Sequence, residues 1–336
     1  MTASNPTWAV VATVDEPPAV VQAFVAWHLS MGASHVSIYC DRPDDPLVDI
    51  LRDLPKVTVI ASDNAHWLTL GSSRPRRHEV RQVRNARHAY AATDADWLIH
   101  MDADEFIWSD APISEHLASL AETVDAWGLP VAERVHLADD PGLSIFEGAF
   151  RRPYHGSNKQ GRETFGRGYY LTYKGLTGHA QGKTFARVNR ALSLSIHRAK
   201  SEVEGYDVIH ERAPCDAVEL LHFDGLTAFQ WSFKLARLAF ALERADGMLP
   251  PVHRARQLKS LYDDRERAPA LYERLKSVDD ALQDVMRAHD VWSQPPFDPG
   301  PALAALFPDA NIDLSPTAID AWLRSNKKHV LSHLKN

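Results

Sequence analysis

The chain has 336 residues, of which 45% are hydrophobic and 24% charged, a composition typical of a globular protein rather than a disordered or fibrous one. Lysine and arginine total 37 against 44 acidic residues, so the formal net charge is −7. This charge argues against nucleic-acid binding, which usually requires a basic domain. Two cysteines, Cys40 and Cys215, are too few for a disulfide framework or a zinc ribbon.

The first eighteen residues lack the basic and apolar regions of a signal peptide, and no uninterrupted apolar run has the length of a membrane span. We therefore expect a cytoplasmic protein. A mildly basic amphipathic stretch at 322–334 would allow at most peripheral membrane contact, although such a helix more often packs against its own domain.

Over the first hundred residues, strand-like apolar runs alternate with helix-like amphipathic stretches. The expected strands are 8–14, 35–40, 56–61 and 97–101, and the expected helices are 17–32, 45–54 and 75–93. Alternation at these lengths predicts parallel strands joined by helical crossovers, which is an α/β fold with an open, doubly wound, mostly parallel sheet and helices on both faces.

After residue 110 the pattern becomes less regular. Strands are expected at 126–137, 184–188, 192–197 and 218–223, and longer helices at 226–245 and 316–334. Residues 151–190 hold nine basic residues against one acid, Glu163, and seven of the sixteen glycines, which predicts a long mobile loop before the strand at 184. From 246 onward, prolines separate short helices.

Acidic residues follow each of the first four expected strands. They are Asp15-Glu16, Asp41, Asp63 and the group Asp102-Ala103-Asp104-Glu105. Ligands of open α/β sheets bind beyond the carboxyl ends of the strands, so these side chains mark the expected binding edge. Two carboxylates spaced as Asp102 and Asp104 suit a hard cation such as Mg²⁺ or Mn²⁺ that also takes substrate phosphate oxygens. The alternative is a solvated turn in which Asp102 caps a following helix.

These motifs together resemble a family 2-type glycosyltransferase of the GT-A fold, in the bacterial branch with an Asp-x-Asp-Glu-Phe motif. The matching features cover residues 8–240. They are Asp15-Glu16 (Asn-Glu in most of the family), Trp27-His28-x3-Gly32, the strand 36–39 leading into Asp41, the helix with Gln82 and Asn85, Asp102-x-Asp104-Glu105-Phe106, Gly182-Lys183, and Leu221-His222-Phe223 before a helix with Lys234.

The resemblance implies a nucleotide-diphospho-sugar donor, a glycan or related acceptor, and an inverting transfer assisted by Mn²⁺ or Mg²⁺. It implies donor contacts from Asp15, Glu16, Asp41 and Asp102, and metal ligation by Asp102, Asp104 and His222. His222 could equally be a core histidine bonded to a backbone carbonyl. His179 and His197 have weaker claims of the same kind.

Cations for a diphosphate are available in two places. Lys183 is the first candidate in the basic segment, because lysine binds phosphate as a point charge. The helix with Arg77, Arg81 and Arg84 is a second basic concentration, for which we expect a solvated face.

An inverting transfer also needs a general base near the acceptor hydroxyl. Glu133, Asp139, Asp140, Glu211 and Asp224 are the candidates, and Asp224 is preferred because it stands next to the His222 motif.

Two other functions compete with the glycosyltransferase. A nucleotide-sugar pyrophosphorylase would also use metal-binding aspartates in an α/β sheet, but it normally has a phosphate loop rich in glycine and arginine after the first strand, where this chain reads Asp-Glu-Pro-Pro. A non-catalytic carbohydrate-binding protein could retain the fold without turnover. We expect a catalytic domain over 1–245, with an acceptor-side loop region at about 138–182, and a helical C-terminal extension over 246–336.

Overall fold

The structure, a computed structural model, describes residues 5–243, 250–263 and 268–328. The chain forms two compact units. The first comprises Met1–Pro130, Gln181–Leu220 and Phe297–Ala310, and the second Val131–Ala180, Leu221–Pro296 and Asn311–Asn336. The expected division into a catalytic domain over 1–245 and a C-terminal extension over 246–336 stays a prediction.

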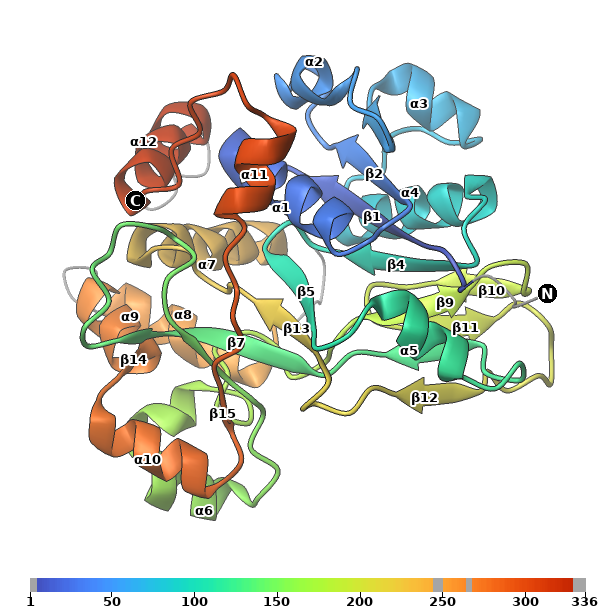
Figure 1. The fold of residues 1–336 in the computed structure, drawn as a ribbon. Helices are drawn as coiled ribbons and strands as arrows, with labels where there is room; N and C mark the ends of the chain where they lie inside the picture. Colours follow the sequence, from blue (N-terminus) through green and yellow to red (C-terminus); the bar gives the residue numbers. More distant parts are fainter. Residues whose placement is uncertain (1–4, 244–249, 264–267, 329–336) are drawn as a thin grey trace. The chain divides into compact units, whose positions relative to one another are not determined.

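A mostly parallel sheet with the strand order β12-β6-β9-β4-β1-β2-β3 forms the centre of the first unit (Figure 1). Its strands are β1 (Trp8–Val14), β2 (His35–Cys40), β3 (Val57–Ala61), β4 (Trp97–Met101), β6 (Ala126–Gly128), β9 (Thr184–Arg187) and β12 (His210–Arg212). Strands β4, β1, β2 and β3 pair in parallel, as do β12 and β6, whereas β9 is antiparallel to both of its neighbours. The predicted Rossmann-like α/β sheet is confirmed, and it is consistent with a GT-A fold.

Helices cover both faces of this sheet, because both faces of β1 are apolar and buried. On one face Ala9 and Val11 pack with Ala86 and Ala89 of α4 (His78–Ala92). On the other, Val10 is fully buried, as a central parallel strand requires. Helix α1 (Pro18–Ser30) begins with a proline at a position where no hydrogen-bond donor is needed, and its residues 20–28 are buried.

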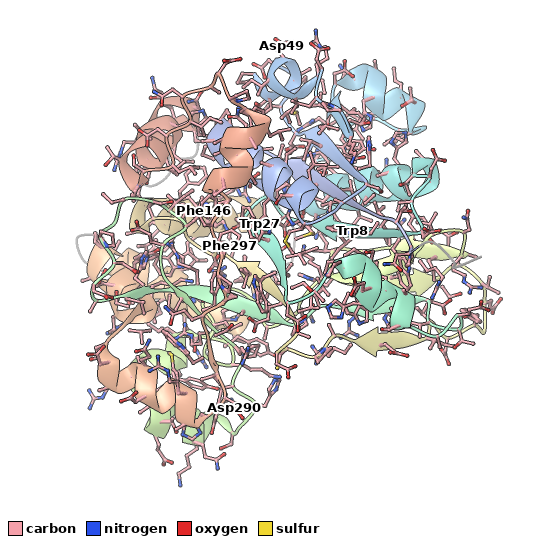
Figure 2. All side chains as sticks on the ribbon, in the orientation of Figure 1. Trp8, Trp27, Asp49, Phe146, Asp290 and Phe297 are labelled. Carbon is pink, nitrogen blue, oxygen red and sulfur yellow. The ribbon has the colours of Figure 1, made fainter. Side chains whose placement is uncertain are left out.

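The chain returns to the first unit near its C-terminal end. Helix α11 (Gly300–Leu306) contacts α1. Just before it, the ring of Phe297 packs against Trp27, with centroids 4.6 Å apart, and against Phe106, at 5.2 Å. Figure 2 shows Trp27 and Phe297 beside each other. A part of the expected C-terminal extension therefore completes the core of the first unit.

Several local predictions in the first unit need correction. The residues after Asp102 form a strand, β5 (Glu105–Ser109), so the alternative in which Asp102 caps a helix is wrong. The apolar run at 126–137 is two strands because Pro130 interrupts it, and the run at 192–197 is a hairpin, β10 (Leu192–Leu194) and β11 (Ala199–Ser201). The remaining helices are α2 (Leu47–Leu51), shorter than expected, α3 (Asn64–Thr69), which was not expected, and α5 (Ile113–Ser119).

The second unit has a smaller sheet with the strand order β15-β8-β7-β13, and β14 pairs with β7. Its strands are β7 (Val131–Leu137), β8 (Ala149–Arg151), β13 (Val218–His222, which begins in the first unit), β14 (Ser277–Val278) and β15 (Trp292–Ser293). Its helices are α6 (Asn158–Phe165), η1 (Arg167–Leu171), α7 (Ala228–Glu243), α8 (Val252–Asp263), α9 (Ala268–Lys276), α10 (Asp280–Ala288) and α12 (Pro316–Asn326).

The basic segment expected to be a long loop contains regular structure. Helix α6 starts with a capping box, in which the Ser157 side chain and the Gln160 side chain each bond the other's backbone N–H, and η1 follows directly. Residues 244–245 and 329–334 of two expected helices lie outside the described residues. Among the helices that the structure describes, none combines the length and the apolar character needed to cross a bilayer.

Candidate functional site

The carboxyl ends of β1 and β4 lie side by side where the strand order of the first sheet reverses. From β1 the chain proceeds to β2 and β3 on one side, and then returns to place β4 on the other side of β1. A reversal of this kind is the usual ligand site of an open α/β sheet. Asp15 and Glu16 follow β1, and Asp102 follows β4, so these predicted residues flank that point.

Lys183 reaches the same edge because β9 is antiparallel to β4. Phe185 pairs with Ile99, which places the start of β9 beside the end of β4. The Lys183 side chain is fully buried, and its Nζ lies 2.8 Å from Oδ2 of Asp102 and 3.3 Å from Oε2 of Glu105. Burial alone would lower the pKa of Lys183, but its ion pair with Asp102 outweighs burial and raises that pKa above its usual range. Lys183 is therefore a fixed cation at neutral pH.

Asp102 is held in one orientation from two sides. Its Oδ2 accepts from Lys183, and its Oδ1 accepts from Nε2 of Gln82 on α4 at 2.6 Å. The turn after it is closed reciprocally, since the Asp102 N–H donates to Oε2 of Glu105 and the Glu105 N–H donates to the Asp102 carbonyl. Burial raises the pKa of Glu105 to about 8, against the opposing charge of Lys183.

Asp102 and Asp104 are the predicted ligands of a divalent metal ion. Both are carboxylates, and oxygen donors of this kind are what Mg²⁺ and Mn²⁺ prefer. Each carboxylate oxygen has two lone-pair directions, so Oδ1 of Asp102 can accept from Gln82 and still face a cation. The Asp102 side chain is 29% exposed, whereas Asp104 is buried. His222, the third predicted metal ligand, belongs to the second unit.

Asp41, which follows β2, is engaged by arginines rather than open to solvent. Arg81 binds it through two hydrogen bonds, Nε to Oδ1 at 2.6 Å and Nη2 to Oδ2 at 2.7 Å, and Arg74 adds a third at 3.1 Å. Burial would raise the pKa of Asp41, but hydrogen bonds from His78 and Arg81 hold that pKa well below its usual range. We expected the helix face that carries Arg81 to be solvated. That expectation is wrong for Arg81, whose side chain is 11% exposed.

Asp15 also has a basic partner. Its Oδ1 accepts from Nε of Arg42 at 2.9 Å, and the same guanidinium bonds Asp45 at 2.5 Å. The Asp15 N–H donates to the Glu16 carboxylate. Three of the predicted donor residues, Asp15, Asp41 and Asp102, therefore stand beside Arg42, Arg81 and Lys183 respectively, residue types that also bind phosphate.

The second unit contains a buried cluster of charged groups around Glu133 of β7. Its Oε1 accepts from the Thr177 N–H and hydroxyl, both at 2.8 Å, and from Lys276 Nζ at 2.9 Å. Its Oε2 accepts from the Gly178 N–H at 2.6 Å. Burial would raise the pKa of Glu133, but the charge of Lys276 outweighs it and lowers that pKa to about 2. With four donors, Glu133 organises the Thr177–Gly178 loop.

Asp224, the preferred general base, belongs to the same cluster. The Thr177 hydroxyl contacts its Oδ2 at 2.9 Å, and Arg254 donates to its Oδ1 at 2.9 Å, with Lys234 at 3.6 Å. Burial would raise the pKa of Asp224, but the charges of Arg254 and Lys234 hold it well below its usual range. Asp224 is therefore ionised at neutral pH, as a general base must be.

Three histidines surround the Thr177–Gly178 loop. The ring of His222, at the end of β13, stacks on that of His179 with centroids 5.0 Å apart and planes at 24°. The His253 Nε2 lies 2.6 Å from the Gly178 carbonyl oxygen. His222 is buried at the end of an apolar strand. This setting agrees with both readings of His222, as a ligand and as a core histidine.

Gly178 is required at the centre of this cluster. A Cβ there would lie 3.0 Å from Oε2 of Glu133 and 3.0 Å from Cε1 of His222. We expect Gly178→Ala to lower the free energy of unfolding by about 1 to 3 kcal/mol, because two buried side chains must shift. Gly128→Ala is the control, since its Cβ would meet nothing closer than 3.7 Å. Chemical denaturation of both variants measures the difference, and equal stabilities would contradict this role of Gly178.

The other candidates have settings of their own. Asp139 and Glu211 are exposed, and Asp140 accepts from the Leu137 N–H at 2.7 Å, as in an ordinary turn. His197 lies 3.2 Å from the Gly182 carbonyl oxygen, through its Nδ1. Lys276, Arg254 and Thr177 were not anticipated, because each comes from an element far along the chain from Glu133 and Asp224. No spacing in the sequence indicates that they meet.

No protein-family model matches the chain, and no curated protein sequence matches it. Solved structures give low-scoring likenesses. HddC from Yersinia pseudotuberculosis has a TM-score of 0.33 at 11% identity, covering 62% of this chain and 89% of that one. TarS 1–349 from S. aureus has a TM-score of 0.28 at 12% identity, covering 97% and 87%. A 4-diphosphocytidyl-2C-methyl-D-erythritol synthase has a TM-score of 0.24 at 12% identity, covering 46% and 67%. Scores this low carry no argument, so the fold class follows from the strand order itself.

Proposed function

We propose that the chain is a metal-dependent, inverting glycosyltransferase that moves a sugar from a nucleotide-diphospho-sugar to a glycan or related acceptor. The observation that carries the proposal is the set of acids after β1 and β4, at the reversal of strand order, with a buried lysine bonded to Asp102. The sequence motifs that resemble the glycosyltransferase family fall on these residues.

The donor half of the reaction belongs to the first unit. Asp102 and Asp104 would hold Mn²⁺ or Mg²⁺ against the donor diphosphate, where the ion would neutralise the charge of the leaving group. Lys183 and Gln82 fix the orientation of the Asp102 carboxylate. In the same proposal Asp15, Glu16 and Asp41 face the nucleoside, and Asp41 acts partly by positioning the guanidinium of Arg81.

The acceptor half belongs to the second unit. In an inverting transfer, an acceptor oxygen forms a bond to the anomeric carbon while the bond from that carbon to the diphosphate oxygen breaks. We assign Asp224 to take the proton of the acceptor hydroxyl, because the neighbouring Arg254 and Lys234 keep its carboxylate ionised. His222 remains the proposed further ligand of the metal.

Donor binding is tested by thermal shift with UDP, GDP, CDP and dTDP, each with and without Mn²⁺. A ligand that binds only the folded chain raises its stability by about 2.7 kcal/mol at a hundred times its dissociation constant. We expect one nucleotide to stabilise the protein, and only with Mn²⁺ present. The absence of any shift with all four nucleotides would contradict the proposal.

Product analysis separates the proposed reaction from its alternatives. With a nucleotide-sugar and an acceptor, a glycosyltransferase releases the nucleoside diphosphate and extends the acceptor. A pyrophosphorylase would instead release pyrophosphate from a nucleoside triphosphate and a sugar phosphate. A non-catalytic carbohydrate-binding protein would do neither, while still binding glycan.

A further inference from the structure

Two half-exposed tyrosines of the second unit lie against one side of helix α8. Tyr170 and Tyr173 are each 48% exposed. The guanidinium of Arg256 lies 3.8 Å from the ring centroid of Tyr170, and the ring of His253 stacks on that of Tyr173 at 5.7 Å and 27°. His253 and Arg256 are three residues apart on α8, so they share one side of the helix. The two rings therefore line one surface, which we call the tyrosine surface: Tyr170, Tyr173, Lys174 and Arg256.

The backbone holds this surface in a fixed conformation. Tyr173 and Leu176 exchange two backbone hydrogen bonds, at 2.8 and 3.0 Å, around a tight turn with Lys174 and Gly175 at its centre. Arg256 Nη1 donates to the Tyr170 carbonyl at 3.0 Å. A surface that is ordered before its ligand arrives loses less entropy on binding.

Lys174 occupies a backbone conformation that lysine rarely adopts. Its φ is +53° and that of Gly175 is +88°, the left-handed pair of a type I′ turn, for which Asn-Gly is the preferred sequence. The lysine at this position places its Nζ 5.9 Å from the ring centroid of Tyr173. An unfavourable backbone conformation retained beside an exposed aromatic ring is typical of a functional position.

The surface is close in the structure to the proposed base. His253, under the ring of Tyr173, contacts the Gly178 carbonyl, and the neighbouring Thr177 contacts Asp224. Exposed tyrosine rings offer an apolar face to the C–H face of a sugar, and a guanidinium and an ammonium beside them select negative charge. The segment 151–180, which contributes the two tyrosines and Lys174 to this surface, has a single acidic residue, Glu163.

We propose that the tyrosine surface binds the acceptor and that this acceptor is an anionic glycan, with carboxylate or phosphate groups on its sugars. Arg256 and Lys174 pair with the negative groups, while Tyr170 and Tyr173 stack on the sugar rings. This inference rests on the proposed function only in calling the bound glycan the acceptor. Binding of the glycan itself needs no donor and no metal.

The test is calorimetric titration of the full chain, without nucleotide or Mn²⁺, with four probes. Oligogalacturonate carries charge on sugars, a phosphodiester-linked saccharide carries phosphate on sugars, and maltooligosaccharide carries no charge. Polyphosphate is a fourth probe with charge and no sugar. We expect one or both charged saccharides to bind, and both maltooligosaccharide and polyphosphate to bind at least about tenfold more weakly. Equal binding of polyphosphate, equal binding of maltooligosaccharide, or no binding of either charged saccharide would overturn the proposal.

Four variants assign the binding to these residues. Tyr170→Ala, Tyr173→Ala and Arg256→Gln are each expected to weaken it about tenfold. Lys174→Asn should weaken it too, while raising the melting temperature because asparagine tolerates the left-handed conformation. Tyr262→Ala is the control, a tyrosine 45% exposed and roughly 120° round α8 from Arg256. Loss of binding in Tyr262→Ala as well, or none in the four variants, would overturn the assignment.

The two proposals fail separately in these measurements. A nucleotide shift with Mn²⁺ but no glycan binding would reject the anionic acceptor and leave the transferase in place. Glycan binding without any nucleotide shift would leave the tyrosine surface in place and favour the non-catalytic alternative.

Discussion

Asp104→Ala is expected to abolish the Mn²⁺-dependent stabilisation by the donor nucleotide. Asp104 is buried in the turn between β4 and β5, and the proposal makes it a direct ligand of the ion. Without its carboxylate, the ion retains Asp102 alone in this turn, and Asp102 already shares one oxygen with Lys183. The measurement is thermal shift at a saturating nucleotide concentration, where the lost stabilisation is about 2 to 3 kcal/mol.

Two controls separate loss of the metal from loss of the fold. Asp49→Ala removes a carboxylate whose side chain is 82% exposed, and Arg76→Ala removes an exposed cation of the same unit, so both should keep the full nucleotide shift. Asp104→Asn retains the size of the side chain and should melt near the unaltered protein in the absence of ligand. Equal loss in Arg76→Ala and Asp104→Ala would count against the proposed metal site.

The binding edge of the first sheet could be predicted because it depends on local sequence. Each apolar run ends at a polar residue, and parallel strands bring those ends to one edge, so Asp15, Asp41 and Asp102 follow from the strand pattern alone. Lys183 was also anticipated, but not its contact with Asp102. That contact depends on β9 being antiparallel to β4, which nothing in the short run 184–187 reveals.

The cluster around Glu133 could not be assembled from the sequence. Lys276 lies 143 positions from Glu133 along the chain and Thr177 lies 44, so their meeting is a product of tertiary packing. The sequence of the basic segment also suggested a loop, because glycine and arginine lower the apolar periodicity. The structure forms α6 there because the capping box supplies hydrogen bonds that periodicity does not measure.

Glu133→Gln is expected to lower the free energy of unfolding at neutral pH by about 3 to 5 kcal/mol. It leaves the fully buried Lys276 ammonium without the carboxylate that lies 2.9 Å away. Burial lowers the pKa of Lys276 to about 8, even with the charges of Glu133 and Asp224 nearby. The double variant Glu133→Gln with Lys276→Met removes the stranded charge and should recover at least half of the loss.

The pH dependence gives the same pair a second signature. The folded-state pKa of Glu133 is about 2, below its ordinary value of 4.5, because Lys276 outweighs burial. A carboxyl group with a lowered pKa stabilises the fold above its ordinary pKa, and this stability is lost as the pH falls toward the folded-state value. The stability difference between the unaltered protein and Glu133→Gln should therefore shrink as the pH falls from about 4.5 toward 3, by about 1.4 kcal/mol per unit at most.

Urea denaturation between about pH 7 and pH 3 measures both effects. Asp263→Asn, which breaks the exposed pair with Lys259, is the matched control and should change stability by less than about 1 kcal/mol at every pH. A loss in Glu133→Gln as small as that of the control would show that the cluster contributes no more than a surface ion pair. The expected large loss, relieved in the double variant, would instead establish that Glu133 and Lys276 jointly hold the Thr177–Gly178 loop beside Asp224.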